Sequence, residues 1–93
     1  MRYPEYMERQ LVIKNRLGLH ARAAAKMVQL SNEFASNLII RFDGQEIDGK
    51  SILNILTLAC PLGSDILLQA EGPDAEKLLE AMERLINDKF GEE

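Results

Sequence analysis

The sequence predicts an α+β domain in which three helices pack on one face of a mainly antiparallel, four-stranded sheet. Short segments with alternating apolar and polar residues are typical of half-buried strands, and segments with apolar residues at helical spacing separate them. The segments follow the order β-α-β-β-α-β-α, and a chain of 93 residues holds one domain with one modest core. We expect that domain to span residues 8–90, between polar tails at residues 1–7 and 91–93.

The first strand, loop and helix are predicted from the N-terminal third of the chain. In residues 8–14, Leu11 and Ile13 alternate onto one face, which predicts a strand. Residues 15–19 predict a loop, in which Gly18 supplies backbone freedom. The alanine-rich segment from residue 21 to residue 32 favours a helix with one apolar face.

A hairpin is predicted in the middle of the chain. Residues 37–42 alternate and predict a second strand, with Leu38 and Ile40 on its inward face. Asp43-Gly44 is a strong turn signal, so residues 45–48 are expected to form the partner strand.

The remaining elements are a short helix, a strand and a long helix. Ser51 is placed as the N-cap of a helix that ends near Leu58, before a proline and a glycine. Residues 65–71 alternate and predict the fourth strand, and Pro73 fits the entry of the last helix. The apolar residues of that helix follow the i, i+3, i+4, i+7 pattern: Ala75, Leu78, Leu79, Met82, Leu85 and Ile86.

Composition argues against several classes of function. The net charge is −4 and the basic residues are scattered, which argues against nucleic-acid binding. No apolar run approaches the roughly 18 residues of a membrane span, and residues 1–6 lack the apolar middle of a signal peptide, so we expect a cytoplasmic protein. Cys60 is the single cysteine, and we interpret it as a small buried hydrophobe, with no metal or cofactor expected.

His20 is the only histidine, and its position favours phosphate chemistry. It lies where a glycine-containing loop becomes a helix, and free N–H groups and the helix dipole attract anions there. Arg22 would add a positive charge beside a phosphate, and a neutral imidazole nitrogen is a competent nucleophile. The residues alone leave open the alternative of an ordinary surface or packing histidine.

The segment Gly18-Leu19-His20-Ala21-Arg22-Ala23-Ala24 resembles the active loop of HPr, the histidine phosphocarrier of the bacterial phosphotransferase system. The resemblance continues at Gly49-Lys50-Ser51-Ile52-Leu53 and Ala70-Glu71-Gly72, and it covers roughly residues 8–90. The run from Lys14 to His20 looks especially like the nitrogen-regulatory branch of the family, NPr. The sugar and nitrogen branches both remain open.

The resemblance implies an HPr-like open-faced β-sandwich and a carrier rather than a self-sufficient enzyme. It implies that enzyme I phosphorylates His20 on Nδ1, with phosphoenolpyruvate as ultimate donor, and that the group passes to the A domains of enzymes II. Arg22 would support the phosphate. We expect a monomer that meets these partners transiently.

The chain departs from the family at Ala23, where proline is usual. Alanine is a good helix former, so the expected cost is about 0.4–1 kcal/mol through the freer unfolded chain, without loss of the chemistry.

Two further expectations concern the segment Gly49-Lys50-Ser51-Ile52-Leu53 and the residues around it. As an N-cap, Ser51 needs no regulatory role; the resemblance implies phosphorylation by a dedicated HPr kinase in bacteria that possess one. In the helix after Ser51, Ile55 and Leu58 are expected to face the core, and the alternative is that all its apolar residues do. The resemblance implies an apolar docking patch beside His20 on the outer face of that helix. Its expected members are Ile52, Leu53 and Leu56, extended by Leu17 and Ala21.

Two other classes of function compete with the phosphocarrier. One is a regulatory binding module that docks a kinase or transcription regulator according to its phosphorylation. The other is a structural domain in which His20 is incidental.

Overall fold

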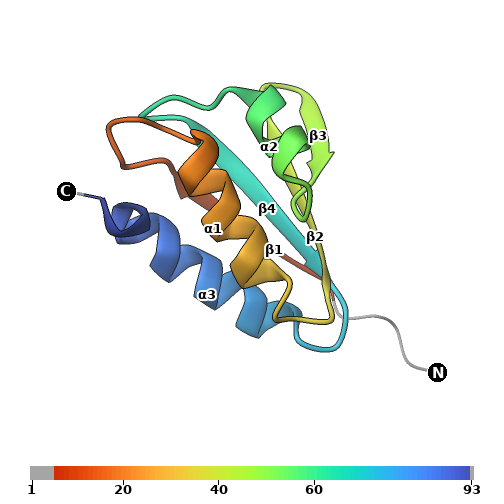
Figure 1. Cartoon of the computed structure of the whole chain (residues 1–93). Coiled ribbons are helices and arrows are strands. Elements are labelled where there is room, and N and C mark those ends of the chain that lie inside the picture. Colours follow the sequence, from red (N-terminus) through yellow and green to blue (C-terminus); the bar gives the residue numbers. More distant parts are fainter. Residues whose placement is uncertain (1–5, 93) are drawn as a thin grey trace.

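The computed structural model describes residues 6–92 and has the predicted element order (Figure 1). No helix in this part of the chain is long and apolar enough to cross a membrane. The elements are β1 (Tyr6–Val12), α1 (Ala21–Ser31), β2 (Asn37–Phe42), β3 (Gln45–Asp48), α2 (Ile52–Leu58), β4 (Asp65–Glu71), α3 (Ala75–Asn87) and a C-terminal 3₁₀ turn, η1 (Lys89–Gly91).

The four strands form one sheet in the order β1-β4-β2-β3, and every neighbouring pair is antiparallel. The three α-helices lie on one face of the sheet, as predicted (Figure 1). Asp43 and Gly44 join β2 to β3 with φ angles of 53° and 80°, the left-handed values that a tight two-residue hairpin turn requires. The Asp43-Gly44 turn prediction is therefore confirmed.

The bounds of β1 differ from the prediction of a strand at 8–14 after a tail at 1–7. The strand begins at Tyr6 and ends at Val12, because its partner sets its length: these residues lie opposite Glu71 and Asp65, the two ends of β4. The chain stays paired beyond the strand, since the N–H of Ile13 donates to a loop carbonyl at 2.9 Å. Residues 1–5 of the predicted tail lie outside the described part of the chain.

The core fills the space between the sheet and the helices. The alternation predicted for β2 and β4 is confirmed, because their inward residues are buried. The C-terminal turn also contributes to the core through Phe90, which is completely buried. The largest fully buried side chains are Ile13, Met27, Leu38, Ile40, Ile55, Ile66, Leu68, Leu78, Leu79, Met82, Ile86 and Phe90.

Helix α2 begins as predicted, with the hydroxyl of Ser51 accepting the N–H of Asn54 at 3.2 Å. Ile55 is buried and Leu53 is 76% exposed, as predicted. Leu56 was expected to face outward, but it is half-buried and packs against the core. It follows the buried Ile55 by one position, at the edge of the inward face, so neighbouring elements cover part of it.

Substitutions on the two faces of α2 should differ in their effect on the free energy of unfolding. We expect Ile55→Ala to lower the free energy of unfolding by about 2–5 kcal/mol, because truncating a buried aliphatic side chain loses burial and leaves a cavity. Leu53→Ala should change it by less than about 0.5 kcal/mol, since that side chain is mostly in water. Urea unfolding of both variants measures the difference, and equal losses would contradict the orientation of the helix.

Candidate functional site

The loop before α1 is tied to the body of the domain by its backbone. The N–H of Leu19 donates to the carbonyl of Cys60 at 2.9 Å, so the loop lies directly against the segment that follows α2. The N–H of Gly18 donates to the carbonyl of Asn15 at 3.1 Å, and the Asn15 amide donates to the carbonyl of Gly18 at 2.7 Å. These bonds hold the residue that precedes the helix in one place.

His20 is that residue, and it is the N-cap of α1. Its backbone is extended, with φ −79° and ψ −179°, and its Nδ1 accepts the backbone N–H of Arg22 at 3.3 Å. Nδ1 therefore carries a lone pair, and in the neutral ring the proton resides on Nε2. Nε2 in turn contacts the Glu92 carboxylate, to which it donates.

The contact with Glu92 corrects the expectation that residues 91–93 are solvated surface. The Glu92 side chain is 12% exposed and also accepts the Asn15 amide at 3.0 Å. The chain turns back toward His20 because Lys89 and Phe90 both have positive φ and Phe90 is buried in the core. Gly91 also belongs to this turn, whereas Glu93 lies outside the described residues.

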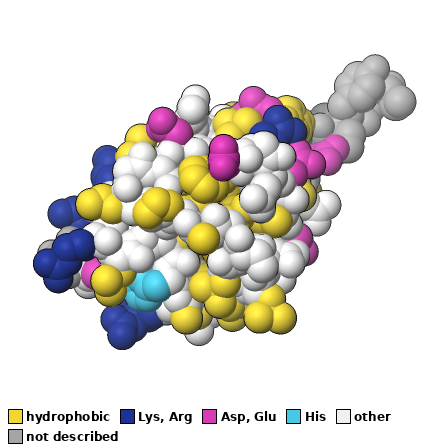
Figure 2. Space-filling view, turned by 90° about the horizontal axis from the view of Figure 1, so that it is seen from above, with side chains coloured by type: hydrophobic (Ala, Val, Ile, Leu, Met, Phe, Trp, Pro, Cys, Tyr) yellow, Lys and Arg dark blue, Asp and Glu magenta, His cyan; other side chains and the backbone are white. Residues whose placement is uncertain are grey.

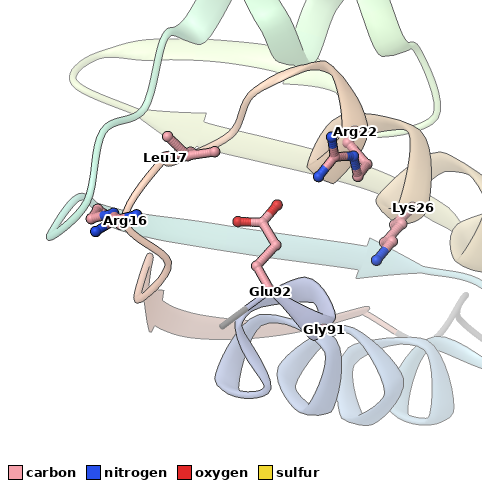
Figure 3. A pocket seen from close by; sticks show the side chains of 6 residues that line it. All are labelled: Arg16, Leu17, Arg22, Lys26, Gly91 and Glu92. Carbon is pink, nitrogen blue, oxygen red and sulfur yellow. The ribbon is translucent and has the colours of Figure 1, made fainter.

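A shallow pocket of about 260 Å³ adjoins this contact. Figure 3 shows the Glu92 side chain entering the space between the loop that precedes α1 and the first turns of that helix. Burial raises the pKa of Glu92, but hydrogen bonds from Asn15 and His20 and nearby positive charge outweigh it, so the pKa lies below its usual value. Glu92 is therefore ionised at neutral pH. The pocket is lined by Arg16, Leu17, Arg22, Lys26, Gly91 and Glu92.

The predicted apolar patch is divided between two elements. Leu17 is 64% exposed and Ala21 is exposed beside His20, while Ile52 and Leu53 are exposed on α2. Figure 2 shows the histidine at the surface, with basic side chains nearby and hydrophobic ones on both sides of it. Leu62, on the loop after α2, is a further exposed hydrophobic side chain that was not predicted. That loop meets the loop before α1 through Cys60, a contact between distant segments that no local sequence pattern signals.

The protein-family model described as "PTS HPr component phosphorylation site" matches residues 7–88 of the chain. The chain belongs to the HPr family. It is 41% identical to phosphocarrier protein HPr of Cupriavidus necator, covering 92% of this chain and 97% of that one. It is 40% identical to phosphocarrier protein NPr of Shewanella violacea, covering 92% and 94%.

The fold agrees with that membership. The crystal structure of HPr-C-His from Thermoanaerobacter tengcongensis superposes with a TM-score of 0.90 at 41% sequence identity, covering 94% of this chain and 98% of that one. The prediction of an HPr-like phosphocarrier fold is therefore confirmed. The similar identities to an HPr and an NPr protein do not separate the two branches of the family.

The described part of this HPr-family chain holds one buried thiol and no cluster of side chains that could bind a metal ion. Cys60 is 2% exposed, and burial raises the pKa of its thiol to about 11, as expected of a small buried hydrophobe. Within residues 6–92, no three His, Cys, Asp or Glu side chains come together as a metal ion would require. The His20 side chain is 24% exposed and is held in a defined orientation by contacts at both ring nitrogens.

The loop before α1 should depend on Gly18. Its φ is +69°, and a Cβ there would clash with the Cys60 carbonyl and lie 2.9 Å from the Cα of Pro61, so backbone would have to move. Gly63 has φ +90° with nothing near its Cβ position, so Gly63→Ala should cost only the left-handed strain, about 1–2 kcal/mol.

Gly18→Ala should cost about 1–3 kcal/mol more than that control, because it adds overpacking to the strain. Chemical denaturation of the two variants measures the difference. Equal costs would mean that the loop and the segment after α2 separate easily.

Proposed function

We propose that this chain is a reversible phosphoryl carrier of the phosphoenolpyruvate-dependent phosphotransferase system. His20 accepts the group from enzyme I and passes it to an enzyme II A domain. One observation carries the proposal: Nδ1 of His20 points its lone pair at the N-terminus of an eleven-residue helix, while Nε2 is occupied by Glu92. The ring therefore offers one nitrogen for attack, at a place suited to an anion.

In the proposed step, Nδ1 of His20 attacks the phosphorus of the donor's phosphohistidine. The new N–P bond forms as the donor's N–P bond breaks, and the bonding electrons return to the donor's ring. The Nε2 proton stays in place. Once Nδ1 is occupied, the N–H of Arg22 no longer donates to it and is free to meet a phosphoryl oxygen. The guanidinium of Arg22 supplies further positive charge, and catalysis depends on this positioning and charge stabilisation.

The docking surface in this proposal is the apolar patch beside His20. Leu17 and Ala21 contribute from the active loop and α1, and Ile52 and Leu53 from α2, with the exposed part of Leu56 at the edge. A small apolar patch with basic residues at its rim suits short-lived complexes with proteins of acidic surface. We propose that the chain meets these partners as a monomer in the cytoplasm, where phosphoenolpyruvate is available.

Ser51 is proposed as a regulatory site in bacteria that contain an HPr kinase. Ser51 is half-buried, and its hydroxyl caps the N-terminus of α2, next to Ile52 and Leu53. A phosphate there would add about −1.5 to −2 charges within the docking patch and repel acidic partners. Charge placed on the patch, rather than a change of fold, is thus the proposed mode of regulation.

Phosphorylation tests the proposal directly. Enzyme I and phosphoenolpyruvate should place one acid-labile, base-stable phosphate on the wild-type chain, and His20→Ala should abolish it. His20→Asn is the matched control for folding, because asparagine retains an N-cap acceptor, whereas alanine loses about 0.5–2 kcal/mol of capping. Both variants should remain unlabelled while His20→Asn keeps the wild-type melting temperature.

Labelling of either variant would assign the phosphate to another residue. No label on the wild-type chain would favour the structural-domain hypothesis. A chain that is labelled but fails to pass the group to any A domain would favour the regulatory binding module.

The docking patch is tested by binding. We expect Leu53→Ala to weaken binding to enzyme I about fivefold or more, because a central interface side chain commonly contributes more than about 1 kcal/mol. Val12→Ala is the control, since Val12 is exposed on the sheet face opposite to the core. Titration calorimetry should find wild-type affinity for Val12→Ala, and an unchanged affinity for Leu53→Ala would remove Leu53 from the interface.

A further inference from the structure

We propose that Glu92 is a positioning residue for phosphoryl transfer: its carboxylate holds His20 in the tautomer and orientation that present Nδ1. This inference rests on the proposed phosphocarrier function and adds a residue to it. One carboxylate oxygen receives the Nε2–H of His20, and the other receives the amide of Asn15 at 3.0 Å. The ring is therefore held at both nitrogens, by Glu92 at one edge and by the N–H of Arg22 at the other.

The C-terminal turn is built to deliver this carboxylate. Phe90 is completely buried and anchors the turn in the core, and the Lys26 ammonium donates to its carbonyl at 2.5 Å. Lys89 and Phe90 have φ angles of 57° and 58°, which are costly for side-chain-bearing residues. This strained backbone lies between Phe90, which is anchored in the core, and Glu92, which contacts His20. We infer that the turn is kept because it places the Glu92 carboxylate beside the histidine.

Asn15 carries a second cost in the same place. Both of its amide protons are engaged, one by the carbonyl of Gly18 and one by Glu92, and these acceptors fix the amide's orientation. Its Oδ1 is then buried without a hydrogen-bond partner among the described residues. An orphaned buried oxygen is unfavourable, and the two donated bonds tie the Glu92 carboxylate to the backbone of the loop at Gly18.

The chemistry explains what a carboxylate at Nε2 contributes. When Nδ1 forms its bond to phosphorus, the ring gains positive charge, which the neighbouring carboxylate stabilises. When the phosphoryl group leaves for an acceptor, the bonding electrons return to Nδ1 and the ring departs as neutral imidazole, with its Nε2 proton still in place. No proton has to move in either direction, which suits a reversible carrier.

Glu92 does not occupy the place of the phosphate. It lies at the Nε2 edge of the ring, whereas the phosphoryl group would bind at the Nδ1 edge, beside the helix N-terminus. Repulsion between the two anions is reduced by Arg16, Arg22 and Lys26, which line the same pocket as Glu92 (Figure 3). The carboxylate therefore assists the nucleophile without blocking it.

Two substitutions separate orientation from charge. Glu92→Ala removes both, whereas Glu92→Gln retains an oxygen that accepts the Nε2 proton but has no charge. Glu80→Ala is the matched control, because Glu80 is exposed on α3 and its removal changes the net charge equally. The ¹⁵N chemical shifts of the His20 ring report the tautomer, and rapid-quench kinetics with phosphorylated enzyme I report the transfer rate and the apparent affinity separately.

For the wild-type chain and Glu92→Gln, we expect the ¹⁵N shifts of the Nε2-protonated tautomer. Glu92→Ala should instead show a mixture of tautomers. The maximal transfer rate should fall about 10- to 100-fold in Glu92→Ala, the range known for removing a carboxylate that orients a metal-binding histidine, and by less in Glu92→Gln. The affinity for enzyme I should stay at the wild-type value, and Glu80→Ala should behave as wild type.

An unchanged tautomer and rate in Glu92→Ala would overturn the inference while the wild-type chain is still phosphorylated. A fall in affinity with an unchanged maximal rate would also overturn it, because Glu92 would then be a docking residue. If the wild-type chain takes no phosphate from enzyme I, the proposed function itself fails. The ¹⁵N shifts of the His20 ring do not depend on phosphorylation, so they still show whether Glu92 sets the tautomer.

Discussion

The arrangement of the site depends on the start of α1, where the side chain of His20 caps the helix. A helix leaves its first N–H groups without internal acceptors, and Nδ1 of His20 accepts one of them from Arg22. The same nitrogen is the proposed nucleophile, so the need to cap a helix and the need to orient a nucleophile are met by one bond. The loop before the helix is held by the Leu19 bond to Cys60, which places the cap at the surface of a rigid domain.

The electrostatics of the site differ from those of the whole chain. The net charge is −4, yet Arg16, Arg22 and Lys26 line one pocket beside His20. Scattered basic residues in the sequence thus meet in space because the loop and the first turns of α1 bring them together (Figure 3). A locally positive site on an acidic protein favours a phosphoryl group and an acidic partner at that point.

Much of the fold could be predicted because its determinants are local. Alternation in β2 and β4, the Asp43-Gly44 turn and the Ser51 cap each act within a few residues, and all are present in the structure. The ends of β1 could not be predicted in this way. They are set by the length of β4, which lies far away in the sequence. Leu56 is similar, since its half-burial depends on what packs beside α2.

The sequence by itself determined the element order, the family resemblance and the candidacy of His20 and Arg22, because motif and periodicity are properties of neighbouring residues. Only the tertiary structure decided which nitrogen of His20 is available and which residues surround it. Glu92 lies 72 positions from His20 and reads as part of a polar tail in the sequence. It reaches the site because Phe90 is buried and the backbone turns back at positive φ. Burial of Phe90 in the core offsets the cost of that backbone, and this balance between distant parts of the chain leaves no local sequence pattern.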